Sequence, residues 1–167
     1  MILEILLAFP VLIAAYIIQT TLMVRITLLN GFPDLTMLIL IAWVLQEDSK
    51  YAWIWAILGG LITGFSSAIP WFIFPVSYLL IIIIAQRFKS RIWQSPILAM
   101  MLMTASGTFI LLGVEFIALQ VMGINLIFSE ILTRTILPSM LLNLLLAFPI
   151  YYLMKEFGKL LYPNKSV

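Results

Sequence analysis

Long apolar runs separated by short polar segments make up almost the whole sequence. The runs are Ile2–Val24, Asp34–Leu45, Tyr51–Ser66, Trp71–Ala85, Ile97–Val121 and Thr135–Met154. As a helix, Asp34–Leu45 would be only about 18 Å long, short of the roughly 30 Å of a bilayer core, and the third and fourth runs are short too. We predict an all-α, polytopic integral membrane protein of about six short transmembrane helices. They form a single domain over residues 1–167, and the second run is its weakest span.

A polar interruption over residues 19–35 separates the first two runs. It contains Arg25, followed by Gly31 and Pro33, which do not readily continue a helix, so the chain should turn here. Asp34 directly precedes the second run, where a carboxylate can cap the free N–H groups of a helix N-terminus. Two interpretations remain open for this segment: an ordinary loop between membrane helices, or an exposed rim that contacts a partner.

The third and fourth runs are joined by residues 66–70, which are small and uncharged and predict a tight helical hairpin. In the third run Ala56, Gly60 and Gly64 recur every four residues. Such a stripe lets a neighbouring backbone approach closely. It is either an intramolecular packing face or a groove for a partner helix.

Before the sixth run, Leu126–Arg134 is moderately amphipathic and could lie along the membrane interface. Glu130 and Arg134 are spaced for an ion pair within one helix turn. Pro138 falls in the first turn of the sixth run, a position that tolerates proline.

Composition excludes a soluble globular domain. The chain is 64% hydrophobic and 10% charged, with a mean hydropathy of +1.18, and so few charges cannot cover that apolar mass in water. A net charge of +2 without a basic patch gives no indication of nucleic-acid binding.

The distribution of Lys and Arg predicts the orientation. With six spans, one side holds Lys50, Arg87, Lys89, Arg91, Lys155, Lys159 and Lys165, and the other holds Arg25 and Arg134. This excess predicts that both termini are cytoplasmic and that the polar interruption faces outward. The basic linker near Arg87 could also bind anionic lipid headgroups. An interfacial aromatic belt is expected on the cytoplasmic side, from Trp43, Tyr51, Trp53, Trp93, Tyr151, Tyr152 and Tyr162.

Glu115 is the acid that lies well inside an apolar run. With Thr104 and Thr108 it lies along one helical face, which must point into the protein because a carboxylate in hydrocarbon costs on the order of 3 kcal/mol. Asn143 and Gln120 are possible partners. The face is either a ligand or proton site, or an internal hydrogen bond that fixes packing.

The residue types present in the chain argue against the known classes of intramembrane enzyme. The chain has no Cys and no His, which removes intramembrane metalloprotease and Ser–His chemistry. Asp34 and Asp48 are expected at opposite membrane surfaces, so they do not form an aspartyl pair. We predict a protein that is not an enzyme, with no catalytic residues, no cofactor and no metal site.

Around the polar interruption, Gln19-Thr20-Thr21 is followed by Arg25 and then by Gly31-Phe32-Pro33-Asp34-Leu35. This order resembles the opening pattern Q-S-T…R…G-x-x-P-D-L of the MreD family of rod shape-determining membrane proteins. Gly59-Gly60-Leu61 through Ser67-Ala68-Ile69-Pro70 resembles its second signature, and Val114-Glu115-Phe116, Leu137-Pro138 and Asn143 resemble its last two helices. The similarity covers nearly the whole chain. The family often has an Asp in the third helix, where this chain reads Gly64-Phe65-Ser66, so a role of that acid does not carry over.

The resemblance implies a non-catalytic scaffold of the bacterial elongasome in the cytoplasmic (inner) membrane. Such a protein binds MreC directly and works with MreB filaments, a SEDS glycosyltransferase and a penicillin-binding transpeptidase to position peptidoglycan synthesis. The hypothetical partner-binding residues are Arg25, Pro33, Asp34, Gly60, Gly64, Glu115 and Asn143. Six short helices are also similar to the substrate-binding subunits of energy-coupling-factor (ECF) vitamin transporters. That alternative predicts an outer-facing cavity near Glu115 and Asn143.

Overall fold

The computed structural model describes residues 2–46, 51–89 and 95–161, and every regular element in this part of the chain is a helix. The elements in order are α1 (Ile2–Thr21), the 3-10 turn η1 (Met23–Arg25), α2 (Leu35–Val44), α3 (Ala52–Phe65), α4 (Ile73–Lys89), α5 (Pro96–Val121), α6 (Phe128–Ile131), the π-helical turn η2 (Leu132–Ile136) and α7 (Leu137–Leu161). The six apolar runs correspond to α1, α2, α3, α4, α5 and α7, which confirms the all-helical prediction.

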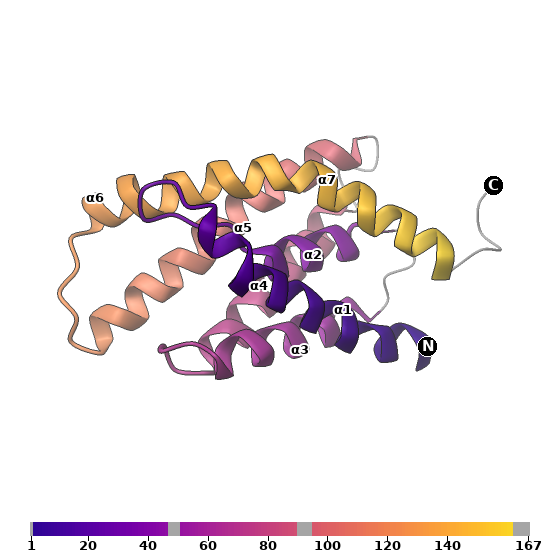
Figure 1. Ribbon diagram of the computed structural model, residues 1–167, viewed down its shortest axis with the longest axis horizontal. Helices are drawn as coiled ribbons and strands as arrows, with labels where there is room; N and C mark the ends of the chain where they lie inside the picture. Colours follow the sequence, from indigo (N-terminus) through magenta and orange to yellow (C-terminus); the bar gives the residue numbers. More distant parts are fainter. Residues whose placement is uncertain (1, 47–50, 90–94, 162–167) are drawn as a thin grey trace.

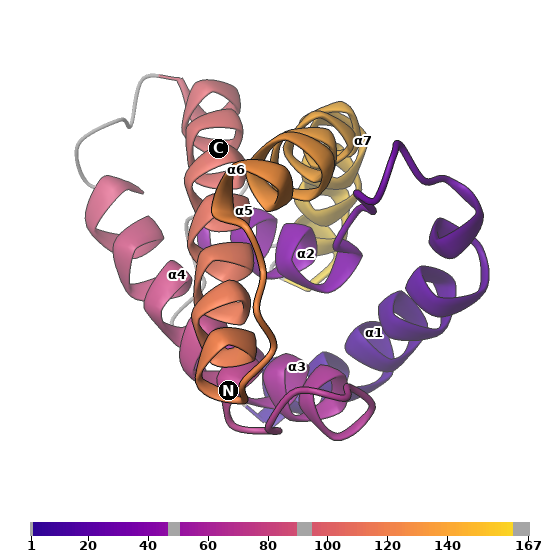
Figure 2. The same ribbon diagram turned by 90° about the vertical axis from the view of Figure 1, so that its left-hand side faces the viewer.

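The helices form a bundle around α2. Viewed from one end, α1, α3, α4, α5 and α7 surround this short central helix (Figure 2), and each of them contacts it. In the side view, the start of α1 and the end of α7 lie at the same end of the molecule (Figure 1). The η1 loop, the α3–α4 turn and α6 lie toward the opposite end, which we call the α6 end.

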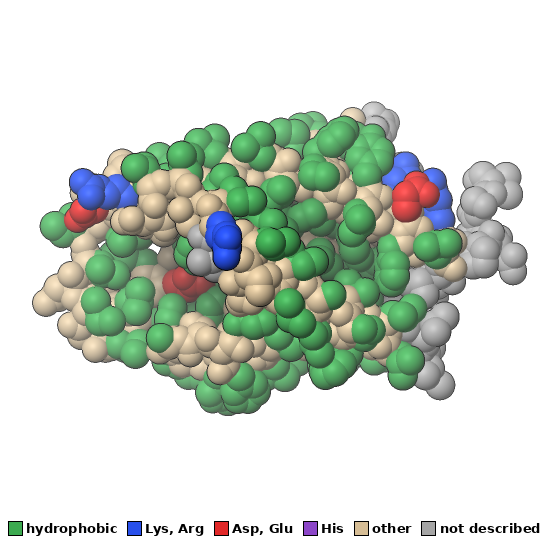
Figure 3. Space-filling view, in the orientation of Figure 1, with side chains coloured by type: hydrophobic (Ala, Val, Ile, Leu, Met, Phe, Trp, Pro, Cys, Tyr) green, Lys and Arg blue, Asp and Glu red, His purple; other side chains and the backbone are tan. Residues whose placement is uncertain are grey.

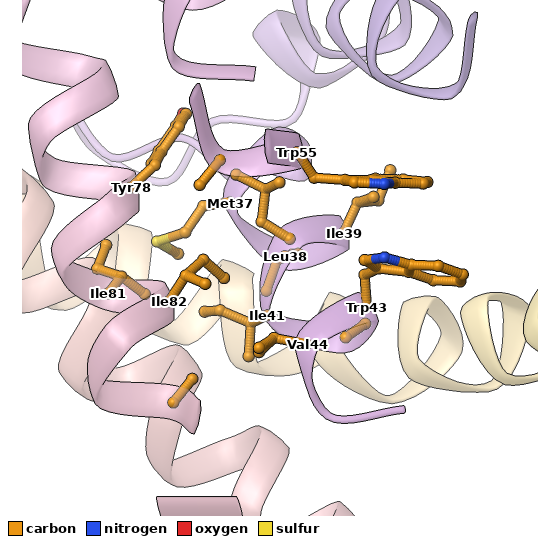
Figure 4. Close-up of a cluster of buried hydrophobic side chains, with 14 of the residues drawn as sticks. Met37, Leu38, Ile39, Ile41, Trp43, Val44, Trp55, Tyr78, Ile81 and Ile82 are labelled. Atoms are coloured by element: carbon orange, nitrogen blue, oxygen red, sulfur yellow. The ribbon is translucent and has the colours of Figure 1, made fainter. Parts of the chain in front are cut away.

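α2 is buried along its whole length. All ten of its residues are buried, so this helix has no face directed to solvent or lipid. Met37 and Ile41 face Tyr78 and Ile82 of α4, while Trp43 stacks on Trp55 of α3 (Figure 4), with ring centroids 4.6 Å apart. A ten-residue helix is only about 15 Å long. The second apolar run is therefore the central core element of the fold.

The C-terminal end of α2 is held by a lysine from α4. Lys89 Nζ donates to the Val44 carbonyl over 3.1 Å and also to the Gln46 carbonyl. The last carbonyls of a helix have no partners within the helix, and its C-terminus favours a positive charge. This contact ties the end of α4 to the central helix.

Two helical stretches of the described chain are long and apolar enough to cross a membrane. They are Pro96–Val121, with 26 residues, and the continuous stretch Phe128–Leu160, with 33. The stretches Ile5–Thr21, Leu35–Val44 and Ala52–Phe65 are apolar but shorter. Hydrophobic side chains are spread over the whole visible face, whereas charged side chains gather near its two ends, with a basic and a recessed acidic side chain between them (Figure 3). These features fit a membrane protein.

The α3–α4 hairpin is confirmed, and its glycines serve that packing. A Cβ atom on Gly60 would overlap the backbone of Pro75, and one on Gly64 would overlap the carbonyl of Trp71. Both glycines therefore face α4, so the small-residue stripe is filled by a neighbouring helix of the same chain. The hypothesis that Gly60 and Gly64 form a groove for a partner is wrong.

The segment Leu126–Arg134 is not a separate interfacial helix. From Phe128 the chain is helical through α6, η2 and α7 without a break (Figure 1). The predicted ion pair is present, with Arg134 Nη1 3.5 Å from Glu130 Oε1, and both side chains are more than half exposed. A pair so exposed adds little to stability.

The aromatic belt is only partly present. Trp43 is fully buried and Tyr151 is 6% exposed, whereas Trp53 and Tyr152 are 48% and 41% exposed. Trp43 faces the core because α2 has no outer face. Trp93 and Tyr162 lie outside the described residues, as do Lys50, Arg91, Lys165 and Asp48 of the charge and catalytic predictions.

Candidate binding pocket

The chain between η1 and α2 is fixed along the start of α7. Three of its backbone N–H groups donate to η2 and α7: Asn30 to the Arg134 carbonyl of η2 at 2.9 Å, Phe32 to Ser139 Oγ of α7 at 3.1 Å, and Asp34 to Asn143 Oδ1 of α7 at 2.8 Å. The donors are alternate residues, as expected of an extended segment with one side facing the helix. The polar interruption is therefore an ordered part of the bundle.

Pro138 and Gly31 make this docking possible. Proline has no N–H, so Pro138 cannot pair with the Arg134 carbonyl four residues earlier, and that oxygen accepts from Asn30 instead. A Cβ on Gly31 would lie only 2.5 Å from the Ser139 nitrogen. Only glycine lets the two backbones approach so closely.

Asp34 caps α2 as predicted, but it is buried. Its Oδ1 accepts from the Met37 N–H at 2.9 Å, and its Oδ2 accepts from Tyr78 Oη at 2.8 Å. Gln19 Oε1 accepts from the next free N–H, that of Thr36, at 3.1 Å. Both oxygens of the carboxylate are thus paired inside the protein, next to the positive end of the α2 dipole.

Asn143 links this cap to α5. Its Oδ1 accepts from the Asp34 N–H, and its Nδ2 donates to Thr108 Oγ1 at 2.9 Å, which in turn donates to the Thr104 carbonyl at 2.8 Å. A hydrogen bond between Asn143 and Glu115 was one interpretation of the sequence, and it is wrong: among the described residues the amide bonds the Asp34 N–H and Thr108 Oγ1 instead. Gln120 donates to the Leu126 carbonyl at 2.8 Å, across the α5–α6 loop.

A pocket of about 470 Å³ opens next to this network. Its walls come from α1, the segment before α2, the α3–α4 turn, α5 and α7. The space-filling view shows a hollow near the α6 end with an acidic side chain recessed in it (Figure 3). The polar lining residues are Tyr16, Gln19, Thr20, Asp34, Thr63, Ser66, Ser67, Thr108, Glu115, Ser139 and Asn143.

Glu115 lies half-buried in the pocket wall. Within the described chain, no protein group donates a hydrogen bond to its carboxylate. Its predicted direction, into the protein, is confirmed by its place in the lining. It is also the pocket carboxylate that the bundle does not use for its own packing.

The seven predicted partner-binding residues are not equally accessible. Pro33 and Asn143 are buried and Asp34 is only 7% exposed, so these residues do not form part of an exposed rim, whereas residues 25–30 of the same interruption are exposed. The burial follows from the docking of the corner on α7. Arg25 is exposed on η1 but does not line the pocket. Arg25 and Glu115 are therefore the predicted residues that another molecule can reach.

Sequence reasoning missed three functional contacts. Tyr78, Ser139 and Lys89 support the polar network and the ends of α2. Tyr78 and Ser139 were not singled out, and Lys89 was considered only as a basic residue of the linker after the fourth run. Tyr78 had a usable signal, because a tyrosine within an isoleucine-rich helix needs a partner for its hydroxyl. Ser139 and Lys89 gave no such signal, since their partners are backbone groups distant in sequence.

Comparison of the chain with protein-family models, curated proteins and solved structures gives no match.

Proposed function

We propose that this protein is a non-catalytic scaffold of the MreD type in the bacterial cytoplasmic membrane, where it binds MreC directly. In this role it helps to position peptidoglycan synthesis by the SEDS glycosyltransferase and its penicillin-binding transpeptidase, with MreB acting indirectly, and so maintains rod shape. It spans the membrane several times with both termini in the cytoplasm.

One observation carries this proposal. Residues of the three segments that resemble MreD lie far apart in the sequence, yet they line one pocket: Gln19, Thr20, Pro33, Asp34, Ser67, Glu115 and Asn143. A chance likeness would scatter such residues over unrelated loops. Their convergence supports the interpretation that the three segments together form one structural site.

The surface supports a membrane location. Large hydrophobic side chains are exposed along α1, α4, α5 and α7, among them Leu6, Val76, Ile117, Leu145 and Leu153, each at least 60% exposed. In water such a surface would aggregate, whereas in a bilayer it is the ordinary outer face of a helix bundle. The outward orientation of the pocket follows from the Lys and Arg count.

We place the docking site for MreC at the pocket end. Arg25 stands exposed in η1 and Glu115 lies in the pocket wall, so together they offer charges of both signs to a partner chain. Charged groups at the rim of an interface act on the association rate and on specificity. The buried Asp34 and Asn143 act through the shape of the pocket.

Co-purification with MreC tests the proposal. With both charges removed in the double variant Arg25→Ala/Glu115→Gln, we expect recovery of MreC to fall by about tenfold, at the low end of the roughly 1.5–7 kcal/mol measured for close interfacial charge pairs. The matched control is Glu130→Gln, which lies in the exposed ion pair of α6 and should bind normally. Absence of MreC from the wild-type preparation would contradict the function, and full recovery by the double variant would contradict the docking site.

A second candidate is the substrate-binding subunit of an ECF-type vitamin transporter. The pocket near Glu115 and Asn143 favours it, because about 470 Å³ lies in the range of small-molecule sites. Mass spectrometry of the denatured preparation distinguishes the two candidates. A tightly held small molecule at one equivalent per chain would favour the transporter subunit.

A further inference from the structure

The pocket has an unusual charge balance. Two carboxylates, those of Asp34 and Glu115, are in its lining, which contains no Lys or Arg. The Asp34 oxygens accept from the Met37 N–H and the Tyr78 hydroxyl. The Glu115 carboxylate has no donor from the described chain, so its oxygens remain available to an occupant.

Three hydroxyl groups of the lining can act toward the pocket only as acceptors. Thr20, Ser66 and Thr108 each donate their proton to a carbonyl of their own helix, over 2.8 to 3.1 Å. A hydroxyl that has donated its proton retains a lone pair and can only accept from a further group. Thr63, also in the lining, is buried, and its Oγ1 has no hydrogen-bond partner among the described residues.

We propose that the pocket binds an organic cation, an alkylammonium or guanidinium group, with Glu115 as its counter-ion. Such a group is charged, has several N–H donors and has no acceptor, which complements the unused carboxylate of Glu115 and the acceptor hydroxyls of Thr20, Ser66 and Thr108. An anion would meet two carboxylates and no compensating base.

Size and lining favour an organic cation over a metal ion. A metal ion needs several oxygen ligands within about 2.5 Å, and the described chain has no group of three His, Cys, Asp or Glu residues that could provide them. Apolar side chains complete the pocket wall: Met23, Phe32, Ile69, Phe74, Leu111, Leu112 and Leu119. They provide a surface for the hydrocarbon part of an amine.

The inference rests on the proposed function, which places the MreC docking site at this pocket. It adds that the docked MreC segment presents a lysine or arginine to Glu115. A free amine would use the same chemistry. The first experiment below needs no MreC, so its failure is distinct from a failure of the proposed function.

Binding to the purified protein in lipid nanodiscs is measured by NMR titration with n-butylammonium chloride. Butan-1-ol and sodium butyrate are the neutral and anionic probes of similar shape. We expect butylammonium to bind at least about tenfold more tightly than butanol, as a hydrogen bond to a charged group implies. The variant Glu115→Gln should remove that preference, whereas the control Glu130→Gln should keep it.

The wild-type comparison does not depend on any variant folding. Equal binding of butylammonium and butanol, or tighter binding of butyrate, overturns the inference. So does an unchanged preference in a folded Glu115→Gln protein.

The source of the cation is tested with peptides and with the native preparation. Preferential binding of Nα-acetyl-lysine amide over Nα-acetyl-norleucine amide supports a partner side chain as the occupant. An amine retained by the protein from its own membrane, detected by native mass spectrometry and lost in Glu115→Gln, supports a free ligand. If neither is observed, the inference is wrong.

Discussion

Replacing Gly60 by alanine is expected to destabilise the protein by about 2 kcal/mol. The added Cβ would overlap the backbone of Pro75 in α4, and overpacking that must move a backbone costs about 3 kcal/mol. Alanine offsets up to ~1 kcal/mol of this cost, because it is a better helix former than glycine. Thermal unfolding in detergent should show a melting temperature lower by roughly 4–8 °C.

Gly113→Ala is the matched control. Gly113 also lies within a helix, but a Cβ there would meet nothing within 4 Å. The alanine should leave the melting temperature unchanged or raise it slightly, because only helix propensity changes. Equal effects of the two substitutions would show that close packing of α3 on α4 is not what requires Gly60.

Replacing Asp34 by alanine is expected to lower the free energy of unfolding by about 3 kcal/mol. The change removes the cap from the Met37 N–H, worth about 1 kcal/mol. It also leaves the buried Tyr78 hydroxyl without its acceptor, at about 1–3 kcal/mol. Urea or thermal unfolding monitored by circular dichroism measures the loss.

Asp34→Asn separates these contacts from the charge. The amide oxygen can still cap α2 or accept from Tyr78, so this variant should retain more than half of the lost stability. Glu156→Ala, at an exposed site in α7, controls for removal of a carboxylate in general. If the Asp34→Ala protein is as stable as the Glu156→Ala protein, the polar network does not hold the end of α2.

Local sequence signals were sufficient for the helices and for the Asp34 cap. Apolar runs and the position of Asp34 before Leu35 depend only on neighbours in the chain, and the helices form where those signals lie. The α3–α4 hairpin was equally predictable, because small residues both shape its turn and permit its packing.

The central position of α2 was not predictable from the same signals. An apolar run has the same sequence pattern whether it faces lipid or other helices. Trp43 was therefore expected at the membrane interface, but it lies in the core. The unusual shortness of the run was the one indication. Helix contacts over long sequence separations decide burial, and the sequence pattern does not contain them.

The pocket, too, was only partly predictable from the sequence. Glu115 was identified because a carboxylate in an apolar helix must face inward. The possible hydrogen bond between Glu115 and Asn143 is not formed. The Asn143 amide instead bonds the Asp34 N–H and Thr108. That pairing depends on how the segment before α2 docks on α7, which no spacing along the chain reveals.

The account rests most directly on a second polypeptide occupying the pocket end, and photo-crosslinking in cells tests this. Leu119→p-benzoylphenylalanine places a crosslinker in the pocket lining, and Phe88→p-benzoylphenylalanine places one on α4 at the opposite end of α2. We expect a covalent adduct with MreC from position 119 and none from position 88. A pocket that gives no protein adduct at position 119, in cells that make MreC, would contradict the account.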